Sequence, residues 1–420
     1  RVFVMRWLPA WIADLEREGA VRADLAAAIT GAIVVLPQAL AFAALAGMPA
    51  QYGLYTAVVP CIVAAFFGSS RLMVTGPANA ISLTVLALLA PLAAPESAAF
   101  VALAITLSFM VGVFQLAIGL TSIAKLVDRV PHSVIVGFTA GAALLIINSQ
   151  VRVLLGLDWP RGLSIFETIR RLPAGLDGAH LPTVIVALGT VAACVLARPF
   201  NQRVPYMLVG IVAGSLLAAL LVQTGWGAGL AFTGALTGAW PPFSLPDLRL
   251  DTLQSLLVPA LVMTLLGLAE AVSIAKAIAA RRGEALDGPR EVRAQGLANL
   301  AGAFFSAYPA SGSFNRSGVN VAAGAITPLS AIGSAILLVI IAGAVAPLAQ
   351  WLPHAAVAGI LLMVALLLID LREIRLAFAE GATEWGPLLL TFALTISVSL
   401  EWAILGGLAS HVVLARLRRT

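Results

Sequence analysis

Long hydrophobic runs alternate along the whole chain with short breaks of proline, glycine and charged residues. The runs contain almost no charge, and several reach the roughly 20 residues that cross a hydrocarbon core of about 30 Å as a helix. Because the pattern repeats many times, it predicts an all-α polytopic membrane protein and leaves little room for a β-barrel or a lipid-anchored globule. The clearest runs are 26–45, 100–120, 184–196, 206–222, 256–274, 329–349 and 355–369.

The breaks predict fourteen transmembrane segments. Residues 1–24 are polar and charged and form an amphipathic lead-in without the apolar core of a secretory signal. The repeats 25–252 and 253–420 each hold seven spans, and seven is odd, so the two repeats must lie in opposite orientations. The predicted spans lie near 25–45, 50–68, 75–92, 99–123, 131–150, 181–197, 205–223, 253–276, 294–307, 314–325, 328–350, 354–370, 384–400 and 402–416.

The distribution of lysine and arginine predicts the orientation. If the N-terminus is inside, most basic residues fall in cytoplasmic loops and in the two tails. This places both termini in the cytoplasm, with the protein in the plasma (inner) membrane, and it explains the net charge of +5 without nucleic acid. The exceptions fall in two longer segments predicted to be external, 151–180 and 224–252, and are Arg152, Arg161, Arg170, Arg171 and Arg249.

Composition supports the membrane assignment and argues against an enzyme. The chain is 60% hydrophobic and 11% charged, whereas a soluble domain carries about a quarter charged residues; its mean hydropathy is +1.00. Cys61 and Cys194 lie within apolar runs, and the four histidines are scattered. We therefore expect no disulfide framework, no metal site, no cofactor and no catalytic residue cluster.

Two of the predicted spans are too short to cross a bilayer, and they occupy corresponding places in the two halves. Residues 75–90 open with Thr-Gly-Pro-Ala-Asn, and residues 314–324 follow Tyr-Pro-Ala-Ser-Gly-Ser. Short segments of this kind are the best sequence indication of a transporter site. Arg316 stands at the start of the second one, although a charge at membrane depth costs roughly 2.5–3.5 kcal/mol. Its guanidinium and the free N–H groups of the helix start would together bind an anion.

Four further residues extend this hypothesis. Thr75 and Pro77 suit the cap and first turn of the other short helix, so that two positive helix ends could face one another. Glu270 is a lone acid within an apolar run, and we predict that it carries a proton with the anion. Gln38 stands at a comparable depth and offers both donors and an acceptor.

Structural alternatives exist for each of these residues. Arg316 and Glu270 could pair with each other and hold helices together, and Gln38 could form an interhelical hydrogen bond. Serines near the site, such as Ser313, cap helices routinely.

The same stretches resemble the SulP anion transporters, the sulfate permease or solute carrier 26 family. The motifs occur in order over nearly the whole chain, at 36–49, 52–55, 67–71, 75–77, 270–277, 295–300 and 308–320. The resemblance implies a core domain of approximately 25–123 and 253–350 and a gate domain of approximately 124–252 and 351–420. It also implies an elevator-like movement of the core against the gate, often in a homodimer.

The resemblance also implies a set of substrate-binding residues, which it places on the first, third and tenth segments. Asn315 stands where the family usually has serine, and Ala78 leaves the start of the third segment without a bulky side chain, so the resemblance does not fix the side-chain contacts or the substrate. Glu270 would couple transport to protons. The implied substrate-binding residues are Gln38, Phe42, Pro77, Ala78, Asn79, Phe314, Asn315 and Arg316.

The expected function is secondary active transport of a small anion, as proton symport of a dicarboxylate such as fumarate, or of sulfate or bicarbonate. The partners expected are the anion, protons and the lipid bilayer. An uncoupled anion channel stays open, and so does a proton-coupled nucleobase transporter of the same architecture, which Arg316 in place of an acid argues against. The STAS domain common in the family is absent from this chain, either because it was removed or because it was never present.

Overall fold

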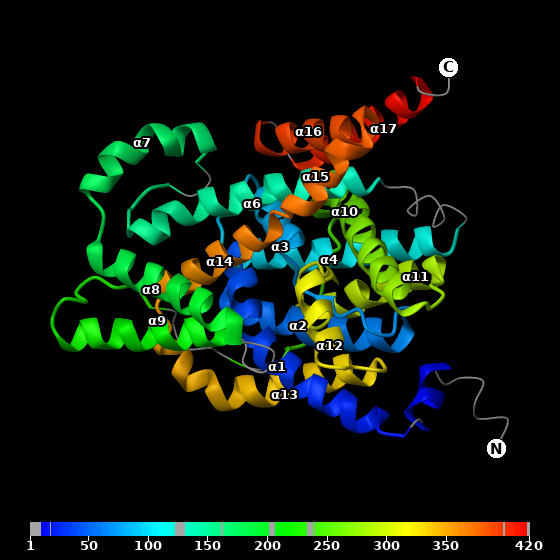
Figure 1. Ribbon diagram of the computed structural model, residues 1–420, viewed down its shortest axis with the longest axis horizontal. Helices are drawn as coiled ribbons and strands as arrows, with labels where there is room; N and C mark the ends of the chain where they lie inside the picture. The colour runs from blue at the N-terminus through cyan, green and yellow to red at the C-terminus, as the bar shows by residue number, and fades with distance from the viewer. Residues whose placement is uncertain are drawn as a thin grey trace. The chain divides into compact units, whose positions relative to one another are not determined.

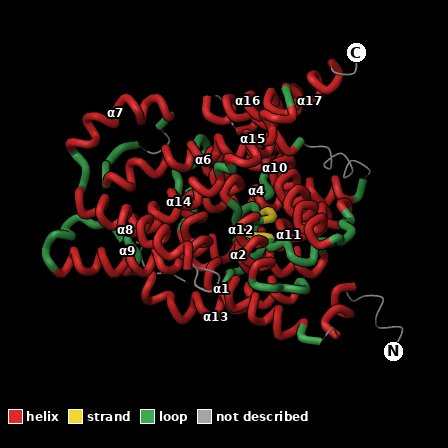
Figure 2. Tube along the Cα trace, viewed as in Figure 1, coloured by secondary structure: helices red, strands yellow, loops and turns green. Residues whose placement is uncertain are grey.

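In its described residues, the computed structural model consists of helices joined by loops, with two very short strands (Figures 1 and 2). It describes residues 10–16, 18–121, 131–160, 163–200, 206–232, 238, 240–397 and 400–417. The chain divides into two compact units, each built from two separate stretches of sequence. Unit one comprises residues 1–129 and 237–346, and unit two comprises residues 130–236 and 347–420.

Unit one contains the two short helices that the sequence singles out, each directly preceded by a strand. Helix α1 packs against α2 and α13, and α4 packs against α10 and α11. Its elements are η2 (Ala10–Glu16), α1 (Ala20–Leu45), α2 (Ala50–Phe67), β1 (Thr75–Gly76), α3 (Asn79–Leu89), α4 (Ala98–Gly119), α10 (Leu250–Arg282), α11 (Gly288–Ala303), β2 (Ser311–Gly312), α12 (Phe314–Ala322) and α13 (Leu329–Val345), after which η4 (Ala346–Trp351) leads into unit two.

Unit two is built from helices alone in its described part. Helix α14 packs against α6 and α8, and α16 packs against α6 and α17. Its elements are α6 (His132–Leu155), α7 (Ile165–Asp177), α8 (Leu181–Ala197), η3 (Arg198–Phe200), α9 (Tyr206–Gln223), α14 (His354–Leu368), α15 (Leu371–Glu380), α16 (Ala382–Ser397) and α17 (Leu400–Leu417).

Hydropathy located the membrane helices but not all of their ends. Within the described residues, six helices are long and apolar enough to cross a membrane, or seven if the bent pair of α7 and α8 counts as one span. Helix α10 was predicted to end near residue 276, but it continues to Arg282. Charged residues mark the edge of the hydrocarbon, whereas a helix ends at a backbone signal. Here that signal is Gly283, at φ 65°.

Two helices of unit two lie between predicted membrane spans. The stretch 151–180, which the pattern predicts to be external, contains α7, and the charged stretch after residue 370 contains α15. Both begin with side-chain caps. Ser164 and Glu167 form a capping box at α7, and Asp370 accepts hydrogen bonds from the backbone of Arg372 and Glu373 at α15.

Close packing in unit one depends on glycine. A Cβ atom on Gly112 of α4 would lie 2.5 Å from the backbone nitrogen of Leu300, and one on Gly296 of α11 would lie 2.6 Å from that of Leu116. The two helices therefore touch backbone to backbone, as small residues permit between membrane helices.

A buried carboxylate joins the first helix to the start of α13. Asp24 of α1 is fully buried, and its side chain accepts hydrogen bonds from the backbone N–H groups of Ile326 (2.7 Å) and Thr327 (3.0 Å) and from the Thr327 hydroxyl (2.5 Å). Three donors around a carboxylate offset the cost of burying it. The loop that follows the short helix α12 is thereby fixed.

Candidate functional site

The two short helices of unit one both begin beside the same pair of strands. Strands β1 and β2 pair antiparallel, with Thr75 opposite Gly312 and Gly76 opposite Ser311. Helix α3 starts three residues after β1, and α12 starts two residues after β2. Because the strands run in opposite directions and each leads directly into a helix, both helix N-termini lie next to the strand pair. Each N-terminus presents free N–H groups and a partial positive charge of about half a unit.

Side chains of α12 fasten it to the segment that precedes β1. The Val74 N–H donates to the hydroxyl of Ser317 (2.9 Å), and the Ser313 N–H donates to the carbonyl of Val74 (3.0 Å). One turn further along, the side chain of Asn320 donates to the carbonyl of Leu72 (3.1 Å). Helix α12 is thus hydrogen-bonded at both its ends to the segment that precedes β1.

The predicted cap of the first short helix is wrong. Thr75 belongs to β1, and Pro77 comes before the N-cap, which is Ala78 and makes no side-chain cap bond. The hydroxyl of Thr75 instead accepts a hydrogen bond from the Gln295 side chain (2.9 Å). Strand pairing with β2 takes up the residues that local sequence would assign to a cap. Ser313 is the N-cap of α12 but also forms no side-chain cap bond. The first N–H groups of both helices therefore have no side-chain cap.

Arg316 lies in the first turn of α12 and is only 3% exposed. None of its three guanidinium nitrogens has a hydrogen-bond partner in the structure. Cys61 and Tyr308 lie near it, and a thiol and a phenol are ordinarily neutral at pH 7. A Cβ atom on Gly76 would overlap Nη1 of Arg316, so the guanidinium lies directly against strand β1.

Glu270 lies beside the other strand. Ser311 of β2 donates its hydroxyl to the carbonyl of Gly267 (2.8 Å), and a Cβ atom on Gly312 would lie 3.1 Å from Cα of Ala271. Strand β2 therefore packs on the turn of α10 that carries Glu270. The carboxylate is half-buried, and its Oε2 atom is buried without a hydrogen-bond partner.

The alternative that Arg316 and Glu270 pair with each other is wrong for this structure. Neither the guanidinium nitrogens nor Oε2 of Glu270 has a partner among the described residues. A buried arginine in a purely structural role would be expected to have an acceptor, because an unpaired buried charge is costly.

Sequence analysis missed a buried polar network that braces the strand pair. Asn299 of α11 accepts a hydrogen bond from the Ala310 N–H (2.7 Å), donates to the carbonyl of Ala310 (3.0 Å) and donates to Gln115 of α4 (2.9 Å). One turn earlier, Gln295 donates to Thr75 (2.9 Å) and to Glu291 (3.2 Å). The polar residues at 291, 295 and 299 share one helix face at i, i+4 spacing, and that spacing was the available signal.

The remaining predicted residues are mostly buried in unit one. Gln38 and Phe42 lie on α1 at 2% and 1% exposure, and Ala78 is 2% exposed. Asn79 begins α3, and its buried Oδ1 atom lacks a hydrogen-bond partner. Pro77 is buried, Asn315 is half-buried, and the Phe314 side chain lies outside the described part of the chain.

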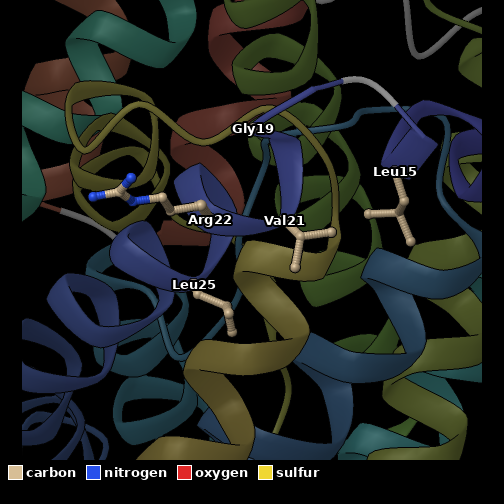
Figure 3. A pocket seen from close by; sticks show the side chains of 5 residues that line it. All are labelled: Leu15, Gly19, Val21, Arg22 and Leu25. Atoms are coloured by element: carbon tan, nitrogen blue, oxygen red, sulfur yellow. The ribbon is translucent and has the colours of Figure 1, made fainter.

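A separate surface hollow of about 460 Å³ lies where η2 meets the first turns of α1 (Figure 3). Leu15, Val21 and Leu25 line it, and Arg22 extends to the other side of α1 from Val21 (Figure 3). None of the predicted site residues lines this hollow. Among the described residues, no group of three His, Cys, Asp or Glu side chains is placed to hold a metal ion.

Comparison with known sequences gives consistent relatives. The sulfate permease family model matches residues 21–383. The chain is 32% identical over 405 residues to Sulfate transporter 4.1, chloroplastic, of Arabidopsis thaliana, covering 94% of this chain and 58% of that protein. It is 28% identical over 448 residues to the Sodium-independent sulfate anion transporter of Bos taurus, covering 98% of this chain and 72% of that protein. The chain thus spans somewhat more than half the length of the plant relative.

Solved structures resemble the whole chain. The transmembrane domain of a cyanobacterium bicarbonate transporter, BicA, matches with a TM-score of 0.79 at 26% identity, covering 94% of this chain and 97% of that one. The murine Solute Carrier 26 family member A9 anion transporter, in its inward-facing state, matches with a TM-score of 0.87 at 20% identity, covering 100% of this chain and 72% of that one, which shows the fold alone.

These relatives are membrane transporters and not enzymes. The expected helical membrane fold is confirmed, whereas the division into fourteen segments stays a prediction. The family match covers most of the chain, and the resemblance first seen in the motifs is confirmed. The chain belongs to the sulfate permease family.

Proposed function

We propose that this protein is a secondary active transporter of a small anion, which binds between the starts of α3 and α12. One observation carries the proposal, namely that the buried guanidinium of Arg316 has no hydrogen-bond partner among the described residues and lies next to two helix N-termini without side-chain caps. An anion there would receive charge-assisted hydrogen bonds from Arg316 and from backbone N–H groups. The predicted ligand set around it is Gln38, Phe42, Pro77, Ala78, Asn79, Phe314, Asn315 and Arg316.

The energetics favour a bound anion over an empty site. Leaving a buried charge without a partner costs about 3–5 kcal/mol, and each hydrogen bond to a charged group contributes about 1.5–3 kcal/mol. A ligand that supplies the missing negative charge and the missing acceptors therefore recovers energy that the fold itself leaves uncompensated. A neutral ligand would recover little of it, which argues against the nucleobase alternative.

Glu270 supports coupling to protons. It stands on the turn of α10 that packs on β2, close to the strand pair but not paired with Arg316. An ionised carboxylate placed there could take up a proton when an anion binds, and the anion and proton would then cross the membrane with less net charge than the anion alone. We therefore propose proton symport. The candidate substrates are a dicarboxylate such as fumarate, and the inorganic anions sulfate and bicarbonate. An uncoupled channel at the same site is the second candidate.

The two compact units suit an elevator-like movement. All predicted ligand residues belong to unit one, so we propose that unit one is the core and carries the anion, while unit two is the gate. We further propose that both termini are cytoplasmic and that the protein resides in the plasma (inner) membrane. A homodimer is the assembly that we expect.

The test is uptake of radiolabelled fumarate, sulfate and bicarbonate into proteoliposomes under an imposed proton or sodium gradient. Arg316→Ala and Glu270→Gln are compared with the wild type and with two matched controls, Arg375→Ala and Glu380→Gln, which alter the same side-chain types on the exposed surface of α15. Each variant is first checked for monodisperse elution and for its unfolding temperature.

One anion should accumulate only with an inward proton gradient. Arg316→Ala should abolish its uptake, Glu270→Gln should permit exchange but no accumulation, and both controls should resemble the wild type. Normal uptake by a folded Arg316→Ala protein would refute the anion site. Linear flux without saturation would instead favour the channel.

A further inference from the structure

Helix α7 of unit two carries an apolar stripe that the described part of the protein leaves uncovered. Phe166, Ile169 and Leu176 are 73%, 60% and 57% exposed. At 100° per residue these three side chains fall within an arc of about 80° on the helix. Such a stripe on a soluble surface would be unfavourable, because water would have to cover three large apolar side chains in one patch.

The other two sides of α7 have different characters. Thr168 is 5% exposed, and Gly175 is buried against the ring of Trp159, so one side packs on the protein. A third side carries the exposed residues Glu167, Arg170 and Arg171. The apolar stripe therefore lies between a side that packs on the protein and a charged side.

The orientation of α7 follows from its neighbour α8. Helix α8 has 17 residues and no charge, which gives about 25 Å of apolar helix, nearly enough to cross a bilayer. The chain turns by 116° between α7 and α8, which is 26° from perpendicular. A helix that bends this far from a membrane-crossing one lies close to the plane of the membrane. The charged residues of α7 also argue against a path through the hydrocarbon.

The exposed face of α8 continues the stripe. Leu181, Leu188 and Val195 are spaced seven residues apart, so they share one face of α8, and they are 55%, 56% and 51% exposed. In an integral membrane protein, a row of exposed leucine and valine on an apolar helix faces lipid. Leu181 begins α8 only a few residues after Leu176, so the exposed apolar face of α8 begins close to the C-terminal end of α7.

Hydrogen bonds hold the segments on both sides of α7 against helix α6. Asn148 of α6 donates to the carbonyl of Leu163 (2.8 Å), and the His180 N–H donates to the carbonyl of Leu155 (2.8 Å). At the N-terminus of α7, the hydrogen bond from the Ser164 N–H lowers the pKa of Glu167 and holds it ionised in the capping box. The helix is thus held at both ends by contacts to its own unit.

We propose that α7 is an interfacial helix that lies in the surface of the bilayer, with Phe166, Ile169 and Leu176 among the lipid tails and Arg170 and Arg171 at the headgroups. This is the arrangement that an amphipathic helix adopts at a membrane surface, where the apolar face enters the acyl boundary. The aliphatic stem of each arginine side chain is long enough for its guanidinium to reach the level of the lipid phosphates while the helix axis stays deeper. The helix would fix the depth of α6 and α8 in the bilayer.

The test is the depth of nitroxide labels on α7 in nanodiscs of phosphatidylcholine and phosphatidylglycerol. Single cysteines are introduced as Phe166→Cys and Ile169→Cys on the apolar stripe and as Arg171→Cys and Ala174→Cys on the charged side, with Cys61 and Cys194 replaced by alanine. All four labelled positions are exposed, so the label replaces no packed side chain. Collision rates with oxygen, which concentrates in lipid, and with a neutral nickel chelate, which stays in water, are compared at each position.

The oxygen-to-nickel collision ratio should be at least severalfold higher at 166 and 169 than at 171 and 174. Equal ratios at all four positions would overturn the proposal, because α7 would then lie in water. Low collision rates with both agents at 166 and 169 would also overturn it, and would indicate a second copy of the chain on this face. The measurement needs no transport, so its outcome is separate from that of the anion site.

Discussion

The close contact between Gly76 and Arg316 yields a sharp test of the anion site. In the structure a Cβ atom on Gly76 would overlap Nη1 of Arg316 and lie 3.2 Å from its Cζ. Gly76 does not have a positive φ, so alanine can adopt its backbone conformation without strain. The substitution Gly76→Ala therefore acts mainly by moving the guanidinium.

The expected size of the effect follows from the displacement. Carbon and nitrogen atoms without a bond approach to about 3.5 Å at best, so the guanidinium must withdraw by about an ångström or more. A shift of this size removes at least one charge-assisted hydrogen bond to the anion, worth about 1.5–3 kcal/mol. We therefore expect the apparent KM for the transported anion to rise by roughly 10- to 150-fold, since about 1.4 kcal/mol is tenfold.

The assay is the concentration dependence of anion uptake in proteoliposomes at a fixed proton gradient. Gly318→Ala is the matched control, because Gly318 lies in the same short helix as Arg316 and a Cβ atom there would meet nothing within 4 Å. Its KM should stay near that of the wild type. A Gly76→Ala protein that is folded and has an unchanged KM would refute the view that Arg316 binds the anion from its observed position.

Three further predictions concern the framework of the site. Asp24→Ala should lower the free energy of unfolding by about 2–5 kcal/mol, because it leaves buried donors at Ile326 and Thr327 without an acceptor; Asp24→Asn should cost less, and an unfolding temperature for Asp24→Ala equal to the wild type would contradict this. Gly112→Ala should cost about 1–3 kcal/mol, because its Cβ meets the backbone of Leu300 at 2.5 Å, and thermal unfolding beside Gly318→Ala checks it; the idea fails if both variants behave alike. Asn299→Ala removes both hydrogen bonds to Ala310 ahead of β2, so anion uptake should fall even in protein that elutes as a folded species, and uptake unchanged from the wild type would argue against the bracing role.

The sequence alone identified the class of protein and the centre of its candidate site. Hydropathy is a local property, and a span of about 20 apolar residues has few structures available to it other than a membrane helix. The short segments at 75–90 and 314–324 stood out for the same reason, since each is too short to cross a bilayer. Arg316 stood out because a charge in such a place is costly.

Tertiary structure decided what those residues contact. Pairing of β1 with β2 joins segments more than 200 residues apart, and it moved Thr75 from a predicted helix cap to a strand. The absence of any partner for the Arg316 guanidinium could be seen only once its neighbours were in place. The network around Asn299 was hidden because a polar residue on a helix face has no identifiable partner until the facing helix is known.

Helices α7 and α15 follow the same division. Hydropathy shows only that these charged stretches are not membrane spans, whereas side-chain caps begin a helix in each of them. Composition reports how much apolar surface a segment carries but not where that surface points. Local sequence therefore determined which segments enter the membrane, while contacts between distant segments determined the site, because pairing energy depends on partners that no local window contains.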